Sequence, residues 1–304
     1  MPPPPDNKDR QLKSLRSIEA GGLPLDAVER LTEMASRQGT PSEFFTSNFS
    51  ASELILTHEC GFEPLGQVMG TSVYHVGWQY VPRTMWAGSQ ELVTLTEANY
   101  NARHLAMNRL RQEGALLHAD GVVGVRLEMH PFAHEPGLIE FKAIGTAVRA
   151  TNAPPTPTGE PFLSALSGQE HWALRMAGLK PVGFGMGNCT YYQVASWATQ
   201  NATTGGFFGS GWQNQELSDF TQAVYVARER AMDRLDTECR AVGAAGVIGV
   251  TIEADYEEVE IDTGGNSRRE DLIVHFTAIG TAVQFEDTPQ RTPPIPFFLP
   301  LENN

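Results

Sequence analysis

Apolar residues recur with helical spacing in two long stretches of the chain, residues 96–117 and 221–242, and this pattern predicts two long helices. Each stretch follows one predicted strand and precedes two more. The first set of strands covers residues 65–76, 122–128 and 140–148, and the second covers residues 182–194, 247–253 and 275–283. The chain therefore contains the same succession of elements twice.

The sequence itself repeats along with the pattern. Tyr100 and Tyr225 each open the phrase Tyr-x-Ala-Arg-x-x-Ala-Met-x-Arg-Leu-x-x-Glu, and Ala-Ile-Gly-Thr-Ala-Val recurs at residues 143–148 and 278–283. The offset between the copies grows from 117 residues before the long helix to 125 within it and 135 after it. The second copy thus carries two insertions, which we expect to be loops.

A short helix should open each repeat, because Ser50 with Glu53 and Ser167 with Glu170 have the spacing of a capping box. The predicted order is α-β-α-β-β, an α+β fold with the long helix packed on an antiparallel sheet. Two repeated glycines in each first strand predict a bulge or a close approach of another backbone. These glycines are Gly66, Gly70, Gly183 and Gly187.

Composition changes mark five segments along the chain. We expect an N-terminal extension at residues 1–44, repeat 1 at 45–150, a stiff Pro-rich linker at 151–161, repeat 2 at 162–285, and a Pro-rich tail at 286–304. In the extension, residues 1 to about 22 should be mobile, and residues 24–36 should form one amphipathic helix.

The positions at which the two long helices carry the same residue cover too wide a surface for a single apolar stripe, since they include charged residues on both flanks. A second contact, with a neighbouring domain or subunit, would explain this width, although an ordinary amphipathic helix with extended arginines is the alternative. We expect Arg109 to pair with Glu113, and Arg234 with Glu238, beside a subunit contact. The expected interface residues are Tyr100, Arg103, Met107, Arg109, Glu113, Tyr225, Arg228, Met232, Arg234 and Glu238.

Catalytic and cofactor motifs are missing from the repeats: neither copy carries a nucleophile elbow, a recurring Cys/His pair or a phosphate-binding loop with lysine. We expect no enzyme activity and no cofactor. The strongest metal candidates are His130 and His134, but Pro131 makes this segment a turn, and solvated histidines are the favoured interpretation. Two apolar segments could contact a protein partner, through Phe207 and Phe208 in one and Phe297 and Phe298 in the other.

The formal net charge of −14 argues against nucleic acid and anionic lipid as partners. Three cysteines at non-equivalent positions encode neither a disulfide framework nor a thiolate zinc site. The chain shows no signal peptide and no apolar run of about 20 residues. We therefore expect a cytoplasmic protein.

The phrases Ala-Arg-x-x-Ala-Met-x-Arg-Leu, Gly-Val-(Val/Ile)-Gly-Val and Gly-Thr-Ala-Val, found in this order in both repeats, resemble the YbjQ-like family, often labelled heavy-metal-binding. The resemblance implies two dodecin-like βαββ units in tandem and assembly into pentameric rings. It brings no defined set of metal ligands. Unlike single-domain members, repeat 1 lacks a glycine-rich loop before its long helix.

From these observations we expect a non-enzymatic, ring-forming scaffold that recruits other proteins. A metal-sensing or metal-buffering protein and a dodecin-like binder of an aromatic small molecule are the alternatives. Because a two-domain chain cannot fill a ring of five domains, the possibilities are an even ring, two stacked rings, or no closed ring. The extended linker favours a homopentamer of two stacked five-domain layers.

Overall fold

The computed structural model describes residues 5–75, 88–131, 138–151, 159–203, 214–264 and 267–286, and both repeats have the predicted α+β order. Repeat 1 contains α3 (Ala51–Glu59), β1 (Phe62–His75), α4 (Val93–Leu116), β3 (Gly121–Pro131) and β4 (Leu138–Ala150). Repeat 2 contains α5 (Gly168–Met176), β6 (Leu179–Gln193), α7 (Ser218–Ala241), β7 (Gly246–Gly264) and β8 (Ser267–Phe285). None of these described helices is long and apolar enough to cross a membrane.

Each repeat gives one short strand to the sheet of the other repeat. Sheet 1 has the order β1-β4-β3-β5, and its β5 (Phe162–Leu163) comes from the start of repeat 2. Sheet 2 has the order β2-β6-β8-β7, and its β2 (Gln90–Glu91) comes from repeat 1. The two repeats are therefore separate in the sequence, but each sheet contains residues of both repeats.

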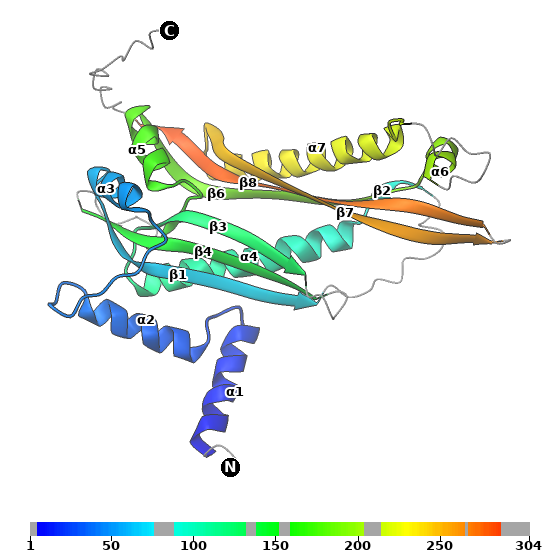
Figure 1. Cartoon of the computed structure of the whole chain (residues 1–304). Helices are drawn as coiled ribbons and strands as arrows, with labels where there is room; N and C mark the ends of the chain where they lie inside the picture. Colours follow the sequence, from blue (N-terminus) through cyan, green and yellow to red (C-terminus); the bar gives the residue numbers. More distant parts are fainter. Residues whose placement is uncertain are drawn as a thin grey trace, which may run out of the picture.

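The long helices and the sheets form alternating layers, with α7 on one side of sheet 2 and α4 on its other side (Figure 1). Helix α4 packs on β1 and β4 of its own sheet and also contacts β6, so it lies between the two sheets. A single apolar cluster joins Met107 and Leu110 of α4 to Met186 and Ile279 of sheet 2. We call the surface of sheet 2 that α4 covers its outer face, and use the same term for the equivalent surface of sheet 1.

The repeated glycines form the bulges and the close backbone contacts that the sequence predicts. The pairing of β1 with β4 shifts at Gly66, and the pairing of β6 with β8 shifts at Gly183, as expected for bulges. A Cβ atom at Gly70 would collide with the backbone oxygen of Ala106 in α4. The equivalent Gly187 lies equally close to α7, so each long helix rests directly on the backbone of its first strand. Both predicted capping boxes are also present.

The N-terminal segment is more ordered than predicted. Instead of a mobile stretch and one helix it forms two helices, α1 (Pro5–Glu19) and α2 (Leu25–Arg37), which we call the N-terminal arm together with the turn between them (Figure 1). The guanidinium group of Arg10 in α1 binds the carboxylates of Asp26 and Glu29 in α2. Leu31 is fully buried in the core beneath α2. Contacts far apart in sequence, including the buried Leu31 and the hydrogen bonds of Arg109 to the carbonyl groups of Ile18 and Gly22, hold this segment, and polarity alone does not predict them.

The two insertions of repeat 2 are not simply loops, as was expected. The first contains the helix α6 (Trp197–Thr203), and the second lengthens the β7–β8 hairpin, whose strands continue to Gly264 and Ser267. Arg269 and the phenol of Tyr192 bind the fully buried carboxylate of Asp271 at the base of this extension. This buried polar cluster fixes the longer hairpin against β6.

Candidate functional site

The most distinctive surface is the seam at which α4 of repeat 1 meets sheet 2. The hydroxyl of Tyr100 donates to Glu238 Oε2 at 3.0 Å, and Met107 packs in the apolar cluster that includes Met186. The buried guanidinium of Arg103 donates to the hydroxyl of Thr277 and lies 5.1 Å from the ring centre of Phe141. Three predicted interface residues therefore do meet a neighbouring domain, within one chain.

Burial and charge define the electrostatics of this seam. Burial lowers the pKa of Arg103 to about 10, although the carboxylates of Glu253 and Asp255 oppose this shift. Burial also raises the pKa of Tyr100 to about 12, and the neighbouring Glu238 adds to the effect. Both groups keep their ordinary charge at neutral pH, so the seam holds a buried cation beside a neutral phenol. This chemistry suits a specific protein contact rather than proton transfer.

Arg109 and Glu113 do not form the predicted pair with each other. The Arg109 side chain donates from Nη1 to the carbonyl oxygen of Thr71 at 2.7 Å, and Glu113 Oε2 accepts from the backbone N–H of Met69 at 2.8 Å. Both partners lie along the edge of β1 that faces away from β4. Backbone N–H and C=O groups along this edge of β1 require hydrogen-bond partners. This requirement outweighs a weak ion pair between two side chains four residues apart on one helix.

The same arrangement recurs at the edge of sheet 2. Arg234 Nη1 donates to the carbonyl oxygen of Asn188 at 2.7 Å, and Glu238 Oε2 accepts from the backbone N–H of Met186 at 3.3 Å. The Arg and Glu shared by the two long helices therefore serve the edge of each helix's own sheet. These Arg and Glu contacts account for one flank of the surface that the two long helices share, and the seam accounts for the other flank.

Strand β2 of repeat 1 extends the edge of sheet 2 just beyond these side chains. Gln90 and Glu91 lie opposite Tyr192 and Tyr191, and the backbone N–H of Leu92 donates to the carbonyl oxygen of Thr190 at 2.8 Å. The Glu91 carboxylate accepts a hydrogen bond from Arg230 at 3.0 Å and forms an ion pair with Arg234, whose Nη2 lies 2.7 Å from Oε1. Repeat 1 therefore binds repeat 2 through an added strand as well as through α4.

Repeat 2 presents the equivalent of this binding surface, and no described residue of the chain covers it as sheet 2 covers α4. Tyr225 and Arg228 of α7, which correspond to Tyr100 and Arg103, are exposed, and Met232 is half-buried. Ile252 and Val250 of β7 are exposed, whereas their counterparts in β3 are buried. We call these five residues the α7 face.

Repeat 1 has the complementary surface, equally open. Met69 on the outer face of β1 is 43% exposed, whereas its counterpart Met186 is 3% exposed beneath α4. Val73 is 55% exposed, and its counterpart Thr190 is 1% exposed. We call Met69, Val73 and the half-buried Ile144 the β1 face. The described part of the chain thus has one closed seam and the two open halves of a second one.

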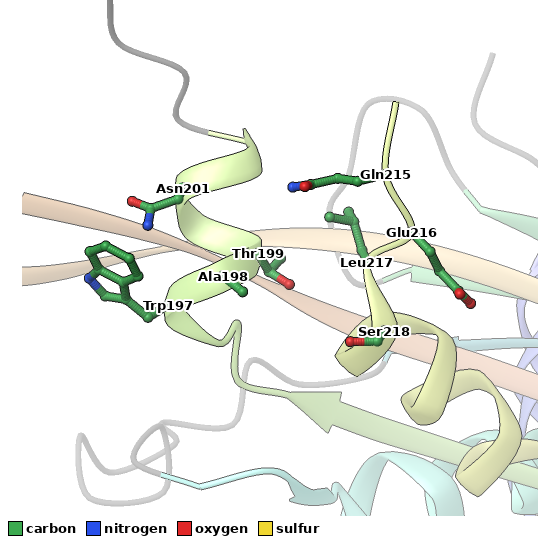
Figure 2. Close-up of a pocket in the computed structure, with 8 residues that line it drawn as sticks. All are labelled: Trp197, Ala198, Thr199, Asn201, Gln215, Glu216, Leu217 and Ser218. Atoms are coloured by element: carbon green, nitrogen blue, oxygen red, sulfur yellow. The ribbon is translucent and has the colours of Figure 1, made fainter. Parts of the chain in front are cut away.

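A cleft of about 310 Å³ lies between α6 and the start of α7 (Figure 2). It is lined by Trp197, Ala198, Thr199, Asn201, Gln215, Glu216, Leu217 and Ser218. Residues 215–217 repeat the Gln-Glu-Leu of residues 90–92, the segment that forms β2 and the cap of α4. This repeat was not among the predicted features, although its spacing of 125 residues matches that of the long helices.

The remaining predicted site residues give no composite site. Phe207, Phe208, Phe297, Phe298 and His134 lie outside the described residues, and the backbone of His130 pairs with that of Glu140 in the β3–β4 ladder. No group of three or more His, Cys, Asp or Glu side chains within the described ranges is arranged to hold a metal ion. The described residues therefore do not fit a heavy-metal centre.

Comparisons with known proteins agree with this architecture. The family model described as "Putative heavy-metal-binding" matches residues 65–151 and 210–286. The chain is also 39% identical over 262 residues to the encapsulin nanocompartment protein Rv1762c of Mycobacterium tuberculosis, and the match spans 85% of this chain and 92% of that protein. This protein accordingly belongs to the YbjQ-like family, as a member with two tandem copies of the domain.

Proposed function

We propose that this chain is a non-catalytic assembly protein whose copies join head to tail. The observation that carries the proposal is the pair of open surfaces on one chain. The α7 face corresponds to the α4 surface that is covered at the seam, and the β1 face corresponds to the part of sheet 2 that covers it. A heterologous contact of this kind continues from copy to copy until the assembly closes.

The similarity to an encapsulin nanocompartment protein supports a proposal about the larger structure to which this assembly belongs. We propose that the present chain is also a component of an encapsulin-type compartment. Contacts with other protein components are assigned to the segments predicted from sequence, around Phe207 and Phe208 and around Phe297 and Phe298.

The seam also bears on the symmetry of the assembly. Because the two repeats of one chain already make the head-to-tail contact, both belong to the same series of domains. We therefore favour a single closed ring with an even number of domains over the two stacked five-domain layers expected from the linker. Native mass spectrometry gives the number of chains, and a homopentamer would then place ten domains in one ring.

Complementary variants test the head-to-tail contact. Tyr225→Glu with Arg228→Glu alters only the α7 face, and Val73→Glu alters only the β1 face. Each variant alone should be monomeric in sedimentation velocity, because each lacks one half of the contact. A 1:1 mixture should form heterodimers and nothing larger, since one intact half remains on each chain.

Ile55→Glu, at an exposed position on α3, is the matched control and should assemble like the wild type. The head-to-tail proposal is wrong if the mixture stays monomeric while this control assembles. It is equally wrong if either variant alone assembles normally.

The compartment proposal has a separate test. In a lysate of the native host, the chain should sediment with particles far larger than its own oligomer, and electron microscopy of those fractions should show closed shells. Migration of the entire pool as the free oligomer would contradict this setting while leaving the assembly intact.

A further inference from the structure

The edge of sheet 2 shows which groups a neighbouring repeat supplies. At this edge, the Glu91 carboxylate binds Arg234 and Arg230, and the Tyr100 hydroxyl binds Glu238. All of these contacts come from β2 and the first half of α4. They define what the equivalent edge of sheet 1 would receive from a second copy.

The N-terminal arm holds the corresponding positions at the edge of sheet 1. Arg109, the counterpart of Arg234, donates from Nη2 to the carbonyl oxygen of Ile18 at 2.9 Å and from Nε to that of Gly22 at 3.1 Å. Arg30 of α2 lies 3.4 Å from the Glu113 carboxylate, where Tyr100 binds Glu238 in repeat 2. The arm therefore occupies the place of an incoming repeat.

We propose that residues 215–217 of a second copy add as a strand to the edge of β1, in the place now held by the turn of the N-terminal arm. The arm is then a displaceable cap on assembly. This inference rests on the proposed head-to-tail function. By equivalence with β2, Gln215 lies opposite His75, Glu216 lies opposite Tyr74, and the N–H of Leu217 donates to the carbonyl oxygen of Val73.

Charge favours this exchange. The partners of Arg109 in the arm are the neutral carbonyl groups of Ile18 and Gly22, whereas a carboxylate would bind it by charge-assisted hydrogen bonds, which are roughly twice as strong as neutral ones. Glu216, the counterpart of Glu91, is exposed and has no ion pair among the described residues. The incoming strand also supplies backbone hydrogen bonds to an open edge, a common mode of peptide recognition.

The cap can open without loss of the whole arm. Leu31 anchors α2 in the core, and Gln38 donates to the carbonyl oxygen of Leu117 at 3.1 Å, so only the turn around Ile18 and Gly22 has to move. Leu105 stands where repeat 2 has Arg230, so the site on repeat 1 offers Glu216 one arginine instead of two. The contact between chains is therefore weaker than the internal seam and reversible.

Two substitutions in the full chain test the inference by sedimentation velocity over a range of concentrations. Arg30→Glu places a carboxylate opposite Glu113 and should release the arm, so that self-association becomes about tenfold tighter; the matched control is Arg37→Glu on the same helix. Glu216→Arg should weaken self-association at least tenfold by repelling Arg109. Its control is Asp236→Arg, at an exposed position of α7 outside the α7 face.

Hydrogen exchange tests the inference independently. On assembly, the amides of Val73 and His75, which face the open edge of β1, should become protected, and those of residues 16–22 should lose protection. Unchanged self-association in Arg30→Glu or in Glu216→Arg overturns the inference, as does an arm that stays protected in the oligomer. If all variants, including Arg30→Glu, are monomeric at every concentration, the proposed function itself fails.

Discussion

Single side chains at the sheet edges explain why certain charged residues recur in both repeats. Arg109 and Arg234 each donate to a backbone carbonyl of the first strand of their own repeat, and Glu113 and Glu238 each accept from a backbone N–H two residues earlier on that strand. An uncovered edge strand is a template for unwanted pairing. Each Arg and Glu therefore binds backbone groups at the edge of its sheet and restricts which strand can pair there.

Replacement of Arg109 by Ala should destabilise the fold by about 1 to 3 kcal/mol, because the carbonyl groups of Ile18, Gly22 and Thr71 lose a common donor. Urea unfolding measures this change. Arg109→Lys should recover only part of the loss, since one ammonium group cannot reach all three oxygens. A fully stable Arg109→Ala protein would show that water replaces the guanidinium group.

His171 makes folding stability depend on pH. Its ring is buried beside Phe62 and Phe162, with Nε2 3.0 Å from the hydroxyl of Ser164, and burial lowers its pKa to about 4. Between pH 6.5 and pH 4 the unfolded chain takes up a proton that the folded chain does not. Stability should therefore fall by about 3 kcal/mol as the pH decreases through this window.

Urea unfolding at pH 7 and at pH 4, with His171→Gln as the comparison, isolates this contribution from that of the carboxyl groups. The glutamine variant should lose about 3 kcal/mol less than the wild type over the same interval. Equal losses in the two proteins would mean that His171 is not the group responsible.

Residues that make long-range contacts were easier to predict from the sequence than the partners of those contacts. The sequence repeat singled out Tyr100, Arg103 and Met107 as residues with a second contact, and they lie against sheet 2 of the same chain, whereas their part in an oligomer interface stays a prediction. It could not predict that Arg109 and Glu113 bind backbone atoms, since partners far apart in sequence are invisible to helical spacing. The recurrence of Gln-Glu-Leu at residues 215–217 was available in the sequence and would have located β2.

At the scale of helices and strands, most of the fold follows from capping boxes, glycines and periodicity. The exceptions include the short elements α6, β2 and β5 and two longer segments with long-range polar contacts, namely α1 and the extended β7–β8 hairpin. Arg10 pairs α1 with α2, and the buried Asp271 holds the base of the hairpin, and neither contact has a local signal in the sequence. Polar composition therefore misled the prediction toward mobile or loop structure.

The contact between each long helix and its first strand depends on one glycine. Gly187→Ala should cost about 1 to 3 kcal/mol or more, because the added methyl group meets the backbone oxygen of Ala231 and cannot be relieved by a change of side-chain rotamer. The control is Gly246→Ala, where an added Cβ has no neighbour within 4 Å. Thermal unfolding of the two variants makes the comparison, and equal midpoints would contradict this packing.

For the whole molecule, the reciprocal strands β2 and β5 make the chain one folding unit. Each sheet is completed by residues that lie on the far side of the linker, and α4 shares its core with sheet 2. Unfolding should therefore occur in one calorimetric transition. Two separate transitions would show that the repeats fold independently.

The exchanged strands also make the peptide bonds of the linker dispensable once the protein has folded. A chain nicked by an inserted protease site within residues 152–158 should stay together as two fragments, and each fragment expressed alone should fail to fold and should recover only when its complement is present. The same interlock has an evolutionary consequence. Deletion of either half would remove a strand from the sheet of the other half, so selection for a folded protein keeps both copies together.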